Sequence, residues 1–186
     1  MNKDELMIAQ LREVFAERPV DRCLAFDIRK EFYIYEDETS NRSFIFKKDG
    51  MPGDGFLIIN PKQKSIRHLS IDHCFFTDGD SYEGKRCDCV VFDDHNFCFI
   101  ELKLNVKWRK ATDQLREARE QIGAVIEFFK EAFDNASKGF LGFELEAFVV
   151  MRQHIYPRNR ANRSSVFVEF LEKYGVTLFE QNCKKF

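Results

Sequence analysis

The sequence predicts an α/β protein in which a central mixed β-sheet is flanked by helices. Two observations favour this class. Helical and extended patterns follow one another as helix, strands, hairpin, long helix, strand, helix and strand. The 186 residues are also 44% hydrophobic and include 21 Phe, which is enough apolar material for one sizeable core. We therefore expect residues 1–186 to form a single domain.

The helices are expected where apolar residues recur three and four positions apart. This spacing predicts a first helix over 3–17 and the longest helix over 108–134, interrupted only by Gly123. A shorter helix over 166–175 ends at its glycine.

The strands are expected where short runs of aromatic and β-branched residues alternate with turn-like polar clusters. These runs are 23–28, 31–37, 42–48, 55–59, 66–71, 87–92, 97–103, 142–151 and 176–182. Their distribution places most strands before the long helix and two after it, which indicates a mixed sheet.

Two of these runs, CDCVVF and FCFIELK, flank the polar turn DDHN and predict a β-hairpin. If the turn pairs Phe92 with Phe97, counting back places Asp88 opposite Glu101 on one face. Lys103 shares that face because side chains alternate along a strand. The other face is expected to be apolar and to consist of Cys87, Cys89, Val91, Cys98, Ile100 and Leu102. Because both faces carry apolar residues, the hairpin is expected to be central and buried.

Asp88 and Glu101 are unusual neighbours in such a hairpin. Opposed carboxylates in apolar surroundings repel each other and lose hydration, so a nearby cation is needed to stabilise their negative charges. Lys103 supplies one positive charge, and a divalent ion held by Asp88 and Glu101 would supply more. Ligation by oxygen alone favours Mg²⁺ or Mn²⁺. The alternative is a structural ion pair between Lys103 and Glu101, with Asp88 capping a turn.

The spacing of these residues resembles a known motif. Asp88, followed by twelve residues and then Glu-Leu-Lys at 101–103, is similar to the signature of the PD-(D/E)XK nuclease superfamily. The resemblance implies the restriction-endonuclease-like fold, a three-layer core with element order αβββαβ, here the first helix and roughly residues 65–155. It implies catalytic roles for Asp88, Glu101 and Lys103, with Mg²⁺ or Mn²⁺ bound by the two acids. The implied activity is hydrolysis of phosphodiester bonds, in DNA rather than RNA. Cys87 stands where many members have Pro.

The same resemblance implies accessory residues. Some members add a Glu from an upstream helix, and others carry a Gln on the helix that follows the motif. The acidic candidates are Glu5, Glu13 and Glu17 in the first helical stretch and Glu83 closer to the motif. The amide candidates are Gln114 and Gln121, for which the alternative is an ordinary position on the flank of a helix.

Two basic clusters contrast with a net charge of −2, which results from 29 Lys and Arg against 31 Asp and Glu. The first cluster contains Lys103, Lys107, Arg109 and Lys110. The second contains Arg152, Arg158, Arg160 and Arg163. Neither cluster contains an acid, and such clusters attract phosphates, while Trp108 and Tyr156 could stack on unpaired bases. Nucleic acid is therefore the expected partner; the alternative is that both clusters are solvated loops.

The six cysteines are expected to be reduced thiols in a cytoplasmic protein, since no apolar N-terminal stretch suggests a secretion signal. No run approaches the roughly 18 to 20 apolar residues that span a bilayer, so no membrane association is expected. The resemblance is compatible with a homodimer, because many such nucleases dimerise to cut two strands.

Two other functional classes remain open at this point. The chain could be a nuclease-like module that binds nucleic acid or a protein partner without cutting. Alternatively, the cluster of Asp88, Glu101 and Lys103 could be a structural ion-pair network, which apolar residues of similar volume would replace without loss of stability.

Overall fold

The computed structural model describes the chain except residues 1, 48, 50–53, 153 and 157–162. Its helices are α1 (Lys3–Val14), α2 (Val20–Cys23), α3 (Ala111–Asn135) and α4 (Arg163–Tyr174), and the 3-10 helix η2 (Trp108–Lys110) directly precedes α3. No helix in the described part of the chain combines the length and apolar character that a bilayer crossing requires.

The strands are β1 (Leu24–Asp27), β2 (Glu31–Asp37), β3 (Arg42–Phe46), β4 (Phe56–Ile59), β5 (Ile66–Ser70), β6 (Cys89–Phe92), β7 (Asn96–Lys103), β8 (Glu144–Met151), β9 (Thr177–Glu180) and β10 (Cys183–Lys185). The nine runs predicted to be extended correspond to the first nine strands, of which only β7 extends beyond its run, by one residue. The predicted helices are confirmed with slightly different ends. The short elements α2 and β10 were not predicted.

The strands form two sheets. The larger sheet has the order β1-β5-β6-β7-β8-β9, with antiparallel neighbours from β1 to β7 and parallel neighbours from β7 to β9. This arrangement confirms the expected mixed sheet. The smaller sheet has the order β10-β4-β2-β3.

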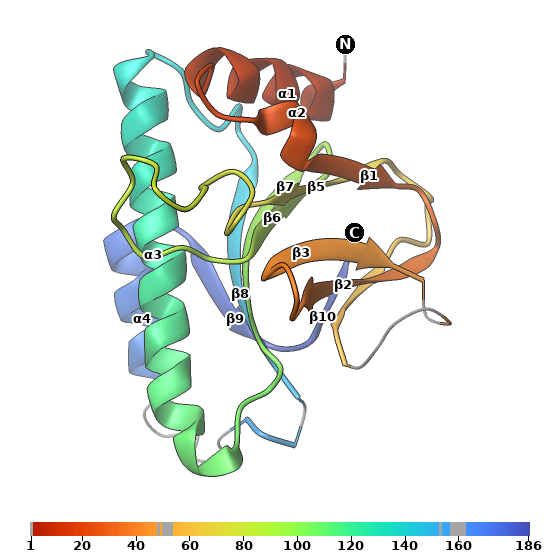
Figure 1. Ribbon diagram of the computed structural model, residues 1–186, viewed down its shortest axis with the longest axis vertical. Coiled ribbons are helices and arrows are strands. Elements are labelled where there is room, and N and C mark those ends of the chain that lie inside the picture. Colours follow the sequence, from red (N-terminus) through yellow and green to blue (C-terminus); the bar gives the residue numbers. More distant parts are fainter. Residues whose placement is uncertain (1, 48, 50–53, 153, 157–162) are drawn as a thin grey trace.

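The two faces of the larger sheet are covered by different kinds of structure (Figure 1). Apolar side chains of α1, α3 and α4 pack on one face and form the larger core cluster. The smaller sheet packs on the other face through Phe32 and Ile34 of β2 and Phe56 and Ile58 of β4. The expected helices therefore cover one face of the larger sheet, and a second sheet covers the other. The strands β2 and β4 alternate apolar residues with the two-residue period of a sheet that buries one face.

The long helix α3 lies along the larger sheet and presents its apolar stripe to it. Gly123 interrupts this stripe for a packing reason. A Cβ atom there would lie 2.3 Å from the hydroxyl oxygen of Tyr174, so glycine allows α4 to approach α3 closely.

The β6–β7 hairpin has the register that the sequence predicts. Cys89 pairs with Ile100 and Phe92 with Phe97, so the next position places Asp88 opposite Glu101. The hairpin lies between β5 and β8 and is buried, as expected. Cys87 is an exception, because it packs in the helix-side cluster while Cys89 packs between the sheets. The strand begins only at Cys89, so strict alternation does not extend back to Cys87.

Two of the six cysteines are joined, which corrects the expectation that all are reduced. Cys23 at the end of α2 forms a disulfide with Cys74, and their Cα atoms are 5.7 Å apart. The bond connects the start of the larger sheet to the segment 71–88, which leads into β6. Cys87, Cys89, Cys98 and Cys183 are free.

Candidate metal and catalytic site

Asp88, Glu101 and Lys103 meet where β7 ends and β6 begins. Asp88 is 7% exposed and Glu101 is 2% exposed. The ammonium nitrogen of Lys103 lies 2.7 Å from Glu101 Oε1. The backbone N–H of Leu102 donates to Asp88 Oδ2, and that of Ile71 donates to the Asp88 carbonyl oxygen at 2.9 Å. Backbone donors from β7 and from the residue that follows β5 therefore hold Asp88 in place.

Burial determines the electrostatics of this cluster. It raises the pKa of Asp88 well above its usual range, and the charges of Glu101 and Glu36 raise it further. Burial also raises the pKa of Glu101 to about 7, although Lys103 opposes the shift. For Lys103, burial lowers the pKa, but the charge and hydrogen bond of Glu101 together with the charge of Asp88 outweigh this effect, so the net shift is upward. The lysine is therefore an ammonium at neutral pH.

One oxygen of Glu101 has no protein partner. Its Oε2 atom is buried and accepts no hydrogen bond from any described residue. A buried acceptor left in this way costs about 1–3 kcal/mol, more for a charged group. An oxygen-ligated divalent ion would satisfy this atom and reduce the repulsion between Glu101 and Asp88, so the residues present fit Mg²⁺ or Mn²⁺.

A third carboxylate, Glu36 of the smaller sheet, lies near enough to raise the pKa values of Asp88 and Glu101 by its charge. It is half-buried at the end of β2, and burial raises its pKa, while Lys103 opposes this shift and Asp72 adds to it. Glu36 and Lys103 line a cavity of about 260 Å³. Sequence reasoning missed Glu36 because it belongs to a strand far from the motif. The sequence does indicate its orientation. Side chains two residues apart on a strand point to the same face, so Glu36 shares a face with Phe32 and Ile34, which are both fully buried.

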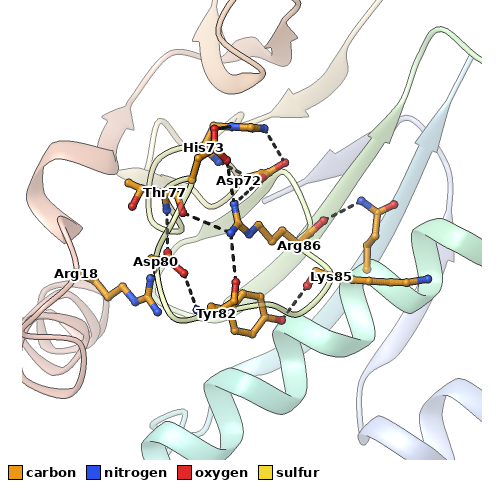
Figure 2. A network of polar contacts seen from close by, with 10 residues as sticks. Arg18, Asp72, His73, Thr77, Asp80, Tyr82, Lys85 and Arg86 are labelled. Atoms are coloured by element: carbon orange, nitrogen blue, oxygen red, sulfur yellow. Dashed lines mark hydrogen bonds and ion pairs between the residues drawn. The ribbon is translucent and has the colours of Figure 1, made fainter.

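Asp72 is a fourth acid near the cluster, and its charge raises the pKa of Glu101 after the effects of burial, Lys103 and Glu36. It lies on the segment 71–88, where Figure 2 shows Arg86 pointing toward it. An Arg86 guanidinium nitrogen lies 3.4 Å from Asp72 Oδ1, and the guanidinium also donates to the carbonyl oxygens of Thr77 and Tyr82. Arg86 thus fixes the position of Asp72 relative to the rest of the segment.

The segment 71–88 is stabilised by further polar contacts (Figure 2). Asp80 accepts hydrogen bonds from the backbone N–H groups of Thr77 at 2.9 Å and Tyr82 at 2.7 Å, and it also pairs with Arg18. The Tyr82 hydroxyl donates to the carbonyl oxygen of Lys85 at 2.8 Å. These contacts order the chain immediately before Asp88.

The accessory candidates have different positions. Gln114 lines the 260 Å³ cavity, so it faces the same space as Lys103. Gln121 donates to the Arg86 carbonyl oxygen at 2.8 Å, and its Oε1 atom has no hydrogen-bond partner among the described residues. Glu83 is exposed, and no contact joins it to Asp88 or Glu101 in the described part of the structure.

The acids of the first helix do not form part of the cluster. Glu5 accepts a hydrogen bond from the Asn2 backbone N–H and caps α1. Glu13 pairs with Lys138 at 3.0 Å, and Glu17 is exposed. The acid outside the hairpin that does influence Asp88 and Glu101 is Glu36 of β2.

The structure brings parts of the two basic clusters together. Lys107, Trp108 and Arg109 line a hollow of about 600 Å³ with His154 and Ile155, which follow β8. Lys110 lines an adjoining hollow, and Arg152 forms an ion pair with Asp54 at 2.8 Å. The hydroxyl of Tyr156 is bonded to the backbone of β8. Arg158, Arg160 and the side chain of Arg163 lie outside the described residues.

A second group of potential metal ligands lies at the hairpin turn. Ligand atoms of Asp93, Asp94 and His95 lie within 4.8 Å of one another. The ammonium nitrogen of Lys64 already lies 2.7 Å from Asp93 Oδ2 and 3.1 Å from Asp94 Oδ1. The contacts with Lys64 supply one positive charge to the two carboxylates from the protein itself.

Comparison of the chain with protein-family models, curated proteins and solved structures finds no match.

Proposed function

We propose that the protein is a Mg²⁺- or Mn²⁺-dependent nuclease that hydrolyses phosphodiester bonds in nucleic acid, with DNA as the preferred substrate. The observation that carries this proposal is the buried pair of Asp88 and Glu101 beside Lys103, in which Glu101 Oε2 has no hydrogen-bond partner among the described residues. A structural ion-pair network would be expected to satisfy both oxygens of its buried acid.

The arrangement of elements supports the resemblance to the PD-(D/E)XK superfamily. The helix α1 precedes the antiparallel strands β5, β6 and β7. The helix α3 then leads to β8, which is parallel to β7. Apart from α2 and β1 to β4, which lie between α1 and β5, this matches the element order αβββαβ. Asp88 directly precedes the second of these strands, and Glu101 lies in the third.

The side chains have distinct roles in the proposed reaction. Asp88 and Glu101 would hold the ion, and Glu36 would add negative charge on the cavity side. When bound, the ion would polarise the phosphodiester and lower the pKa of the attacking water. Lys103 has a raised pKa and so cannot accept a proton at neutral pH. It would orient the water and stabilise the negative charge that develops on the phosphate.

The test has two stages. Mn²⁺ and Mg²⁺ are titrated calorimetrically into the wild type and Asp88→Asn, and each protein is then incubated with plasmid, linear duplex, single-stranded DNA and RNA. We expect metal binding and cleavage in the wild type and loss of both in Asp88→Asn. Lys103→Ala should retain metal binding but cleave at least about 100-fold more slowly, because it removes charge stabilisation from the transition state.

The matched control is Asp93→Asn, which changes a buried carboxylate at the other end of the same hairpin. It should cleave like the wild type once folding has been verified by circular dichroism. If the wild type binds no metal even with nucleic acid present, the nuclease assignment is wrong and the binding module becomes the better description.

A further inference from the structure

Trp108 is unusually exposed for a tryptophan. Its exposed fraction is 72%, the highest among the large exposed hydrophobic residues of the described chain, followed by Phe26 at 62%. It begins η2, the single turn between the end of β7 and the start of α3. A large indole held in water on a short rigid turn is typical of a contact surface, since aromatic side chains concentrate binding energy.

The surroundings of Trp108 indicate which ligand it contacts. The hollow of about 600 Å³ that it lines has a size within the range of sites for small organic groups. Lys107 and Arg109 flank Trp108 in the sequence and line the same hollow, and neither side chain forms an ion pair with another described residue. The stretch 103–110 contains four basic residues and no acid. A ligand that combines flat aromatic rings with regularly spaced anions fits these groups.

The hollow is also connected to the candidate catalytic site. Lys107 lines both it and a neighbouring hollow of about 360 Å³. This second hollow shares Asn105, Val106 and Gln114 with the cavity beside Lys103 and Glu36. A continuous surface therefore leads from Glu36 and Lys103 to the indole along residues 103–110, a stretch that spans at most about 25 Å when fully extended.

We propose that the hollow around Trp108 is a subsite for single-stranded nucleic acid, in which the indole stacks on one base and Lys107 and Arg109 contact phosphates. The inference rests on the proposed function, because it identifies the form of nucleic acid that enters the catalytic site. Stacking requires a base whose face is free, and bases in a duplex are covered by their neighbours. Tyr156 does not serve as a second platform, because its hydroxyl is tied to the backbone of β8.

The chain offers a direct probe, because Trp108 is its only tryptophan. Intrinsic tryptophan fluorescence is measured in EDTA, so that no cleavage occurs, while oligodeoxythymidylate or a blunt duplex of equal length is added. We expect the single strand to quench the fluorescence in a salt-dependent manner and the duplex to leave it nearly unchanged. Equal quenching by the duplex, or binding of a labelled single strand without quenching, would overturn the subsite.

Variants then measure the contribution of stacking. Fluorescence anisotropy of a labelled oligodeoxythymidylate should show about 10- to 100-fold weaker binding by Trp108→Ala and a smaller loss for Trp108→Phe. Phe26→Ala removes an exposed aromatic residue from β1 and should bind like the wild type. Unchanged affinity of a folded Trp108→Ala would refute the subsite.

The two proposals fail in different ways. Quenching without any metal-dependent cleavage would retain the single-strand subsite and reject the nuclease. Cleavage that is lost in Asp88→Asn, together with unchanged single-strand affinity in Trp108→Ala, would retain the nuclease and reject the subsite.

Discussion

The two ends of the β6–β7 hairpin both bury carboxylates, but only one end satisfies them. At the turn, Asp93 is fully buried and accepts hydrogen bonds from the backbone N–H groups of His95 and Asn96, at 2.8 Å and 2.7 Å. Its other oxygen contacts the Lys64 ammonium at 2.7 Å. At the open end, Glu101 has one oxygen with no partner among the described residues.

The difference shows how a structural acid can be distinguished from a functional one in the same pair of strands. Asp93 has as many donors as its two oxygens need, so the folded protein alone stabilises its charge. Asp88 and Glu101 repel each other, and burial raises the pKa of both. A group that the fold stabilises incompletely is a candidate for interaction with a ligand. Variants at both ends of the hairpin can test whether the fold alone stabilises Asp93 and whether Asp88 and Glu101 need a ligand.

The largest expected effect is at the turn. Asp93→Ala removes the acceptor of the turn N–H groups and leaves the half-buried Lys64 without its closest carboxylate. We expect the free energy of unfolding to fall by about 3–5 kcal/mol, as measured by urea denaturation. The neighbouring Asp94→Ala is the control, because Asp94 is more exposed and should cost less than about 1 kcal/mol. Equal losses in the two variants would show that Asp93 is not the centre of the turn.

The disulfide should stabilise the end of the β6–β7 hairpin that carries Asp88 and Glu101 more than the turn at Asp93. Cys23 and Cys74 are 51 residues apart, and replacing both by Ser should lower the free energy of unfolding by about 2–4 kcal/mol. Because Cys74 lies on the segment 71–88, hydrogen exchange should increase there and remain unchanged at the turn. Cys183→Ser, which changes a free cysteine, is the control. Titration of the unfolded, unreduced wild type should find four thiols, and six would contradict the bond.

Without metal, Glu101 should make the protein less stable as the pH rises. Its folded pKa of about 7 lies above the ordinary value of 4.5, so between these values the folded state binds more protons than the unfolded state. Stability therefore falls across this window, by up to about 3 kcal/mol, and the raised pKa of Asp88 acts in the same direction.

Urea denaturation in EDTA at several pH values between 5 and 8 tests this expectation. Glu101→Gln should reduce the decline, because the amide carries no titrating proton. Asp93→Asn should preserve the decline despite its lower overall stability. A wild-type curve that rises between pH 5 and pH 7 would mean that the protein stabilises the ionised Glu101 without a metal.

Much of this contrast was predictable from the sequence, because it depends on local rules. The alternation of apolar residues and the DDHN turn predicted the register that places Asp88 opposite Glu101, and the spacing of apolar residues predicted α3. The contribution of Glu36 was not predictable, because it depends on how two sheets stack. The Cys23–Cys74 bond was missed for the same reason, since residues so far apart in the chain are brought together only by tertiary packing.

The smallest expected effect concerns Glu36, and it tests whether the metal site extends beyond the β6–β7 hairpin to β2. Glu36 belongs to the smaller sheet and lines the cavity with Lys103. Glu36→Gln should weaken Mn²⁺ binding about tenfold, the effect expected of a nearby group that supports the ligands. Asp88→Asn should abolish binding. Glu31→Gln, at the exposed start of the same strand, should bind Mn²⁺ like the wild type in the same calorimetric titration. An unchanged affinity in Glu36→Gln would restrict the site to the hairpin, whereas the expected loss would show that the smaller sheet contributes to metal binding as well as to the core.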